Sequence, residues 1–326
     1  MESDRHRAGG RDRDRGLDGA SRALEAARAL AAGGLVILPT ETVYGLAADA
    51  ADAAAVARLY EAKGRPRFNP LIAHVTDLGM AQRVARLDER ARRLARAFWP
   101  GPLTLVAPIA DAGLVCDLAR AGLDTVAVRA PGHDLAQAVL QAFGRPIVAP
   151  SANRSGRPSP TTFADAVAET GDAAALALDG GPCAVGLEST VVSLLEGPPR
   201  LLRPGAVTRA EIEGLIGPLA EAEADAARSP GRLARHYAPN APLRLNAERP
   251  RAGEAFLAFG PATVAGPQSF NLSPTGDLRE AAANLFRLLR LADATTPAAI
   301  AVAPIPTEGL GEAINDRLER AAGYVG

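Results

Sequence analysis

The chain has 326 residues, of which 48% are hydrophobic and 22% charged, a composition typical of globular proteins with a sizeable core. Its 36 basic and 37 acidic residues leave a net charge of −1, so it lacks the cationic excess of a dedicated nucleic-acid-binding protein. A single hydrophobic core rarely grows beyond about 250 residues, so we expect two domains.

The two cysteines lie far apart and the four histidines are scattered, so neither a disulfide framework nor a zinc site is indicated. No apolar run approaches the roughly 20 residues that span a bilayer. The first residues are charged where a signal peptide would be apolar. We therefore expect a cytoplasmic protein with no membrane-embedded part.

Residues 1–17 mix Arg, Asp and Gly with almost nothing to bury, which predicts a flexible tail. After Asp18, Leu24, Ala27 and Leu30 share one helical stripe that ends at a glycine pair, which predicts a helix. Buried strands are expected at 34–39, 71–75, 102–108, 125–130, 146–150, 175–179 and 189–195. Helices are expected between several of them, at 52–63, 88–98, 133–143 and 162–170. This alternation predicts an α/β domain with a mixed sheet over residues 18–218.

The composition changes near residue 220, where Ala, charge, Pro and Gly replace apolar periodicity, so residues 219–240 are predicted to form a linker. A smaller, Rossmann-like α/β domain is predicted over residues 241–326. Its expected strands and helices lie at 243–245, 255–260, 277–292, 299–304 and from Leu310 onward. This region contains no G-x-G-x-x-G fingerprint, so a dinucleotide site is not expected there.

A polar segment, residues 39–46, directly follows the first predicted strand. Open α/β sheets bind ligands at the carboxyl ends of their strands, so the Thr and Glu side chains here are candidates for substrate contacts. The alternative is that Thr40 caps a short helix and Glu41 points to solvent.

Three cations, Lys63, Arg65 and Arg67, lie within five positions on a loop stiffened by Gly and Pro. Clustered cations repel one another, so the cluster is best explained by a bound phosphate or carboxylate. The alternative is a solvated basic turn. A Walker-type motif is absent from the sequence, so any nucleotide would be held differently from the way P-loop proteins hold it.

Three further polar segments stand at the ends of predicted strands, at 149–160, 186–190 and 202–205. The first is dense in hydroxyl and amide groups. Each is weak evidence in isolation, because Ser, Asn, Gly and Pro also favour ordinary turns.

Together, in this order and at these separations, the segments closely resemble the threonylcarbamoyl-AMP synthase family. The matching stretches are PTETVYGLAADA (39–50), KGRPRFNPLIAHV (63–75), FWPGPLTLV (98–106), VAVRAPGH (126–133), APSANRSGRPSPT (149–161), GLESTVVSL (186–194) and LLRPGAVT (201–208). The resemblance implies a YrdC-like twisted mixed-sheet catalytic domain. SPGRLARHYAP (229–239) and NLSPTGDLREAAANLF (271–286) resemble the linker and appended domain of the family's longer form.

Members of this family join L-threonine, bicarbonate or CO₂, and ATP into threonylcarbamoyl-AMP and pyrophosphate. The product feeds N6-threonylcarbamoyladenosine formation at position 37 of tRNA. The resemblance thus implies a nucleotidyltransferase that passes its product to a tRNA threonylcarbamoyl transferase complex, with direct tRNA binding secondary. Such chemistry needs positioning and charge neutralisation but no covalent nucleophile.

The resemblance also implies roles for individual residues. The group around the reacting carbamate and phosphates comprises Lys63, Arg65, Ser151 and Asn153. The positions that match ATP contacts are Arg65, Asn69, Thr125, Arg129, Ser151, Ser159 and Arg203, with Tyr237 as a lid residue. The threonine pocket is implied to comprise Thr42, His74 and Ser189, with the backbone of Ala149. Without the resemblance, His74 would be read as a core histidine and Tyr237 as a surface anchor.

Mg²⁺ is expected to accompany ATP, with phosphates and water as most of its ligands. Glu41 and Glu188 are candidate protein ligands by position alone.

Three other functional classes fit the sequence less well. An RNA-binding module is disfavoured by the near-neutral charge, because affinity for a phosphate backbone grows with each cation engaged. A carbamoyltransferase of the hydrogenase-maturation type would carry acylphosphatase-like and zinc-finger segments, which the sequence does not show. A regulatory paralogue without activity is disfavoured because Lys63, Arg65, Ser151 and Asn153 are all retained.

Overall fold

The computed structural model describes residues 11–221, 236–261 and 268–323. The helices are α1 (Arg11–Ala31), α2 (Ala53–Lys63), α3 (Leu78–Val84), α4 (Glu89–Phe98), α5 (Asp134–Phe143), α6 (Phe163–Thr170), α7 (Arg209–Ile216), α8 (Leu278–Ala294) and α9 (Leu310–Ala322), with a 3₁₀ turn η1 (Gly171–Ala173). The strands are β1 (Val36–Leu38), β2 (Gly45–Asp49), β3 (Ile72–His74), β4 (Leu103–Pro108), β5 (Thr125–Arg129), β6 (Ile147–Val148), β7 (Leu176–Ala177), β8 (Thr190–Ser193), β9 (Arg200–Arg203), β10 (Ala220–Glu221), β11 (Leu243–Arg244), β12 (Glu254–Ala258), β13 (Ser269–Asn271) and β14 (Ala299–Val302). Within these ranges no helix combines the length and apolar character needed to cross a membrane.

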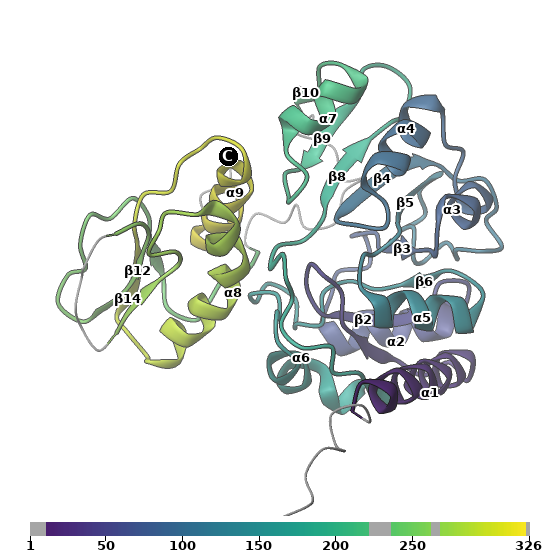
Figure 1. The fold of residues 1–326 in the computed structure, drawn as a ribbon, viewed down its shortest axis with the longest axis horizontal. Helices are drawn as coiled ribbons and strands as arrows, with labels where there is room; N and C mark the ends of the chain where they lie inside the picture. Colours follow the sequence, from purple (N-terminus) through teal and green to yellow (C-terminus); the bar gives the residue numbers. More distant parts are fainter. Residues whose placement is uncertain (1–10, 222–235, 262–267, 324–326) are drawn as a thin grey trace, which may run out of the picture.

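The larger sheet joins ten strands in the order β10-β9-β8-β4-β5-β3-β6-β2-β1-β7 (Figure 1). Parallel pairs such as β3 with β5 and β4 with β8 occur beside antiparallel pairs such as β4 with β5 and β8 with β9. The predicted mixed sheet is therefore confirmed.

Side chains of this sheet alternate between two apolar layers, as the two-residue repeat of a strand requires. On β1, Ile37 packs into the layer that also contains residues of α2, α3, α4, α6 and α7. Its neighbours Val36 and Leu38 pack into the opposite layer, with α1 and α5. On β3, β4, β5, β8 and β9 one face carries a small apolar cluster whose described members all come from these strands, namely Ile72, Val106, Ala127, Val191 and Leu202. This face adjoins the pocket described below.

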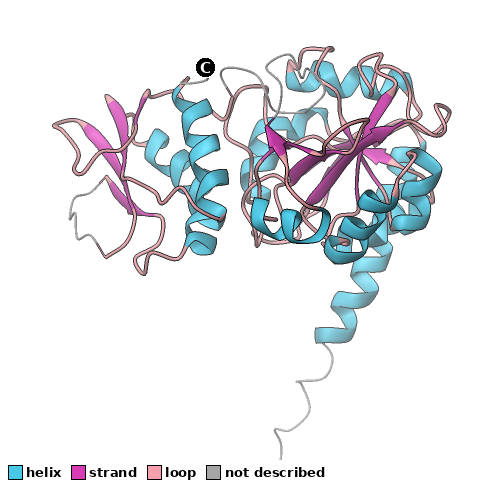
Figure 2. Cartoon of the chain, turned by 90° about the horizontal axis from the view of Figure 1, so that it is seen from above, coloured by secondary structure: helices cyan, strands magenta, loops and turns pink. Residues whose placement is uncertain are grey.

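The second sheet consists of four parallel strands in the order β11-β14-β12-β13. Helices α8 and α9 lie between this sheet and the larger domain in both views (Figures 1 and 2). The predicted smaller α/β domain is confirmed in its architecture, with a parallel sheet and helical connections.

The two domains share one apolar cluster, in which Val43 and Leu187 of the larger domain join Phe286 of α8. At Gly186 the contact is between backbones: φ is +75°, and a Cβ here would lie 2.5 Å from the Cα of Ala283. Only glycine suits both this conformation and this distance. Helix α8 is thus packed directly against the segment that leads into β8.

Several elements differ from the prediction, and α3, α7 and β13 were not expected at all. Helix α1 begins at Arg11, so residues 11–17 of the expected tail are helical, in keeping with the good helix propensity of Arg; residues 1–10 lie outside the described part. Strand β10 pairs with β9 inside the expected linker, of which residues 222–235 also lie outside the described part. Strand β2 is not predicted, because its Gly and Ala have low strand propensity; pairing with β1 and β6 outweighs this.

Candidate active site

A pocket lies against the open face of the larger sheet, where loops from several strands meet the linker. Its lining residues are Thr42, Val43, Arg65, Leu71, Ile72, His74, Arg129, Ala149, Pro150, Ser151, Glu188, Ser189, Arg203, His236 and Tyr237. Every one of the five polar segments picked out in the sequence contributes to this wall. The linker closes the pocket through His236 and Tyr237.

Strand register places three of the polar lining residues on one face of the sheet. Ile72 and His74 are two residues apart on β3 and pair with Ala127 and Arg129 on β5. Residues two apart on a strand point to the same face, so His74 and Arg129 stand side by side above the apolar cluster. Ser189 directly precedes β8 and shares a hydrogen bond of 2.7 Å with Thr104 on β4.

His74 is a neutral hydrogen-bonding group in this pocket. Burial lowers its pKa to about 3, and the neighbouring Arg129 acts in the same direction. Its Nδ1 lies 3.1 Å from the carbonyl oxygen of Ile72, which can only accept, so Nδ1 carries the proton. The other ring nitrogen, Nε2, is then an acceptor that can receive a hydrogen bond from a substrate hydroxyl or amine.

Three arginines supply the positive charge of the pocket. Arg65 donates to the carbonyl oxygens of Asn69 at 3.2 Å and Pro70 at 3.0 Å, and burial lowers its pKa to about 10. Burial also lowers the pKa of Arg203, whose guanidinium donates to the backbone oxygen of Ser189 at 2.9 Å. A desolvated cation is costly without a counter-charge, so this wall is suited to an anion.

The third arginine, Arg129, is paired with Glu41 at 2.6 Å and donates to the backbone oxygen of Gly101 at 3.2 Å. Glu41 is therefore held inside the protein and does not point to solvent. Thr40 does not cap a helix: its hydroxyl donates to the backbone oxygen of Val43 at 2.6 Å and holds a tight turn. This turn places Thr42 in the pocket wall.

Lys63 is the last residue of α2 and is almost fully buried. Its ammonium donates to the backbone oxygens of Ser151 and Asn153 and is not part of the pocket lining. Burial, reinforced by Arg65, lowers its pKa well below the usual value. The alternative of a solvated basic turn is therefore wrong for Lys63, whereas Arg67 on the same loop is exposed.

The segment from Ser151 to Ser159, here called the substrate loop, is held by hydrogen bonds to its backbone. The Asn153 amide donates to the oxygens of Arg154 at 2.8 Å and Arg157 at 2.9 Å, so this side chain shapes the loop from within. Ser159 donates to Glu188 and does not line the pocket. Ser151 is the member of this loop that reaches the pocket wall.

Tyr237 is completely buried although it belongs to the linker. Its ring packs on Phe286 at a centroid distance of 5.3 Å, and the guanidinium of Arg317 lies 5.4 Å from its ring centroid. Burial raises its pKa to about 12. Its phenol oxygen has no hydrogen-bond partner among the described residues, which leaves this buried group able to bind a polar ligand atom.

The structure brings most of the implied site residues together. Nine of them line the pocket: Thr42, Arg65, His74, Arg129, Ala149, Ser151, Ser189, Arg203 and Tyr237. The others do not line it: Lys63, Asn69, Thr125, Asn153 and Ser159. Sequence reasoning assigned no site role to five lining residues, namely Val43, Leu71, Ile72, Pro150 and His236. Four of these are apolar, and only their positions beside polar site residues could have pointed to them, whereas His236 directly precedes the predicted lid residue Tyr237.

The two carboxylates considered for Mg²⁺ are largely engaged by other protein groups. Both oxygens of Glu188 are engaged, one by Ser159 and the other by Arg317 at 2.9 Å. One oxygen of Glu41 is buried and has no partner among the residues that the structure describes, but its other oxygen is paired with Arg129. No group of three or more His, Cys, Asp or Glu side chains is suitably placed in the part of the chain that the structure describes.

Two family models match the chain almost from end to end. A model described as "Telomere recombination" (Sua5_yciO_yrdC) matches residues 28–205, and one described as "Threonylcarbamoyl-AMP synthase, C-terminal domain" matches residues 207–323. The threonylcarbamoyl-AMP synthase of Pyrococcus abyssi is 41% identical over 90% of this chain and 91% of its own length. The enzyme of that name from Bacillus subtilis is 39% identical over 92% of each chain.

This chain belongs to the threonylcarbamoyl-AMP synthase family.

A solved structure supports the same assignment at the level of the whole fold. The crystal structure of P. abyssi Sua5 complexed with L-threonine superposes with a TM-score of 0.87, at 40% identity, over 94% of this chain and 95% of that chain. Family membership therefore covers both domains, and the predicted resemblance is confirmed.

Proposed function

We propose that this chain makes threonylcarbamoyl-AMP and pyrophosphate from L-threonine, bicarbonate or CO₂, and ATP, for N6-threonylcarbamoyladenosine formation at position 37 of tRNA. The observation that carries this proposal is one pocket in which a neutral histidine and hydroxyl groups face three arginines. Such a wall can hold an amino acid and a polyphosphate next to one another. The relative crystallised with L-threonine supports the amino-acid substrate.

The amino-acid half of the pocket is assigned to Thr42, His74, Ala149 and Ser189. Nε2 of His74, as an acceptor, can take a hydrogen bond from the threonine hydroxyl or ammonium group. The guanidinium of Arg203 lies 3.2 Å from the hydroxyl of Ser189, so a carboxylate bound at Ser189 would also meet a positive charge.

The nucleotide half is assigned to Arg65, Arg129, Ser151, Arg203 and Tyr237. The threonine amine attacks CO₂ to give a carbamate, whose oxygen attacks the α-phosphorus of ATP as the bond to pyrophosphate breaks. Negative charge builds up on the phosphoryl oxygens and the leaving pyrophosphate, and fixed guanidinium groups stabilise it. Asn69, Thr125 and Ser159 are assigned as further ATP contacts outside the pocket lining, and Lys63 and Asn153 hold the substrate loop.

Mg²⁺ is proposed to bind together with ATP and to be held mainly by phosphate oxygens and water, because both oxygens of Glu188 already accept hydrogen bonds from Ser159 and Arg317. The labile product requires an acceptor, for which a tRNA threonylcarbamoyl transferase complex is the proposed partner. A cytoplasmic location follows from this role.

The proposal is tested by measuring pyrophosphate release with ATP, bicarbonate and L-threonine, and with each component omitted in turn. We expect release to depend on all three components. Release that continues unchanged without threonine would show that this function is wrong.

A further inference from the structure

Two buried glutamates of the larger domain take no part in the proposed chemistry, and each is paired with an arginine of the smaller domain. Glu169 on α6 pairs with Arg290 on α8, and Glu188 before β8 pairs with Arg317 on α9. Both carboxylates have a pKa below the usual value, since burial would raise it but the arginines outweigh that effect. The pairs are therefore charged links across the domain interface.

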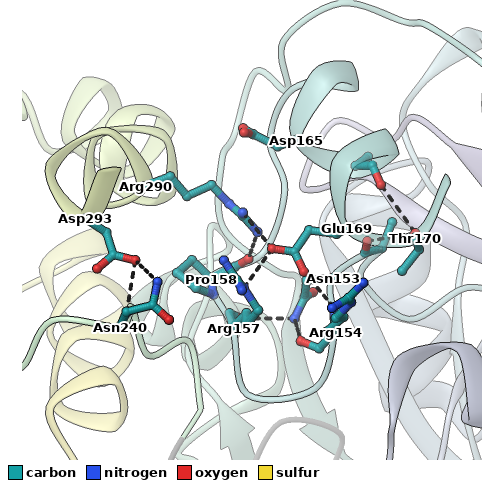
Figure 3. A network of polar contacts seen from close by, with 12 residues as sticks. Asn153, Arg154, Arg157, Pro158, Asp165, Glu169, Thr170, Asn240, Arg290 and Asp293 are labelled. Carbon is teal, nitrogen blue, oxygen red and sulfur yellow. Dashed lines mark hydrogen bonds and ion pairs between the residues drawn. The ribbon is translucent and has the colours of Figure 1, made fainter. Parts of the chain in front are cut away.

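Figure 3 shows how Glu169 connects α8 to the substrate loop. One carboxylate oxygen accepts from the backbone N–H of Arg154 at 3.1 Å. The other lies 2.9 Å from both Arg157 Nε and Arg290 Nη1. Arg290 also donates directly to the backbone oxygen of Pro158. The guanidinium on α8 thus contacts the loop once directly and once through Glu169.

Glu188 connects α9 to the far end of the same loop. It accepts a hydrogen bond from Ser159, the last residue of the loop, and its other oxygen accepts from Arg317 Nε. Arg317 is fully buried and also donates to the backbone oxygen of Pro204 at 3.0 Å. Adjacent loop residues, Pro158 and Ser159, are therefore fixed by different helices of the smaller domain.

The rest of the loop is held from the larger domain and the linker. Lys63 holds the oxygens of Ser151 and Asn153, and Thr170 donates to that of Ala152 at 2.9 Å. The N–H of Ala238 in the linker donates to the oxygen of Gly156 at 2.7 Å. Without the two arginines the loop would keep these bonds, but it would lose the direct bond to Pro158 and the two guanidinium groups that fix Glu169 and Glu188 beside it.

We propose that Arg290 and Arg317 are positioning residues through which the smaller domain fixes the substrate loop, so that Ser151 faces the substrates in one geometry. This deepens the proposed function and rests on it. Association of the two domains would not by itself require Arg290 and Arg317, because buried ion pairs are often no more stabilising than apolar packing. Adhesion is also served by a third interdomain pair, Arg209 with Glu312 at 2.7 Å, which does not contact the loop.

The matched variants are Arg290→Met, which removes the link to the loop, and Arg209→Met, which removes an interdomain ion pair elsewhere. Arg290→Lys can reach Glu169 or Pro158 but cannot span both as the guanidinium does. Arg317→Met alone would leave Glu188 charged and buried, so it is combined with Glu188→Gln. Full-length variants are compared in kcat and KM for ATP, in Tm, and in amide hydrogen exchange of residues 152–157.

We expect kcat/KM for ATP to fall about ten- to a hundredfold in Arg290→Met, as for a misplaced reacting group. Arg290→Lys should recover part of this loss, and the Arg317→Met/Glu188→Gln pair should behave like Arg290→Met. Loop amides should exchange faster in Arg290→Met than in Arg209→Met. The proposal would be overturned if kcat/KM for ATP fell as far in Arg209→Met as in Arg290→Met. It would also be overturned if the loop amides of Arg290→Met exchanged at the wild-type rate. Hydrogen exchange is measured without turnover. It therefore tests whether Arg290 fixes the loop even if pyrophosphate release proves independent of threonine.

Discussion

Two cations from one short motif serve different purposes in this structure. Arg65 stays partly exposed and lines the pocket, whereas Lys63 is turned away and binds backbone oxygens of the substrate loop. The motif spacing explains this, because Lys63 is the last residue of α2 and Gly64 reverses the chain in the left-handed conformation. Side chains on either side of such a turn point in different directions.

Replacing Arg65 with Met should therefore affect ligand binding more than folding. Burial disfavours this charge in the ligand-free protein, which offsets the loss of its hydrogen bonds to the Asn69 and Pro70 oxygens, so the Tm should change little. ATP affinity should fall by roughly tenfold or more, the value of a charge-assisted hydrogen bond. Calorimetric ATP titrations and thermal melts measure the two effects. Arg67→Met, an exposed change on the same loop, is the control and should alter neither.

Lys63→Met should weaken folding and activity together. Two buried carbonyl oxygens would lose their donor, at a cost of about 1–3 kcal/mol in unfolding free energy. Urea titration measures this cost. Unchanged stability together with lost turnover would contradict the loop-holding role and favour direct contact between Lys63 and phosphate.

At the scale of elements, the site depends on a close approach between two segments. A Cβ on Gly205, which follows β9, would lie 2.4 Å from the backbone nitrogen of Thr190 and 2.8 Å from the oxygen of Glu188. This approach packs the turn after β9 against the start of β8. It thereby fixes Ser189, which lies between Glu188 and Thr190 in the pocket wall.

Gly205→Ala should push these segments apart, because backbone atoms cannot yield as a flexible side chain can. We expect a lower Tm and weaker threonine binding. Gly214→Ala is the matched control: it lies within α7 with open space around it, where alanine favours a helix by up to about 1 kcal/mol. Threonine titration and thermal melts of both variants test the claim. Equal threonine affinity in Gly205→Ala and wild type would contradict it.

The sequence predicted the strands that carry the site, because their apolar runs are short, buried and followed by polar segments. It also led to Arg65, His74, Arg129 and Ser189, since these residues lie in the sequence motifs that resemble the threonylcarbamoyl-AMP synthase family. It could not predict which way Lys63 and Asn153 point, because that depends on the turn after α2 and on bonds within the substrate loop. Nor could it predict the interdomain contacts of Arg290 and Arg317. In the sequence these are ordinary charged positions on amphipathic helices, and their partners become visible only in the structure.

At the scale of the whole molecule, the smaller domain contributes to both the core and the site. Val43 and Leu187 are buried against it, and Arg317 of α9 packs on the ring of Tyr237, which lines the pocket. The interface also contains His236, whose pKa burial lowers to about 3. Several groups that titrate in acid are therefore buried in one region.

Stability should fall as the pH decreases. His74 and His236 have folded-state pKa values of about 3, below the unfolded value of about 6.5, so the unfolded chain binds protons first. Unfolding free energy should therefore decline between pH 6.5 and about 3, by up to about 1.4 kcal/mol per pH unit for each histidine. Glu169 and Glu188, with lowered pKa values, add a further loss as pH falls below about 4.5.

Urea titrations of the ligand-free protein at several pH values measure this slope. His74→Gln removes one of the two histidines and should make the slope shallower between pH 6.5 and 5. A wild-type unfolding free energy that stays constant over that interval would contradict the assigned burial of neutral histidines.

The most direct test of the central claim is to follow carbon from ¹³C-labelled bicarbonate into the product by mass spectrometry. The protein is incubated with ATP, Mg²⁺ and L-threonine, and the Arg65→Met variant is run in parallel. We expect one labelled carbon in a compound that contains both threonine and AMP, formed by the wild type and strongly reduced in the variant. Consumption of ATP without any labelled threonine–AMP product would contradict it.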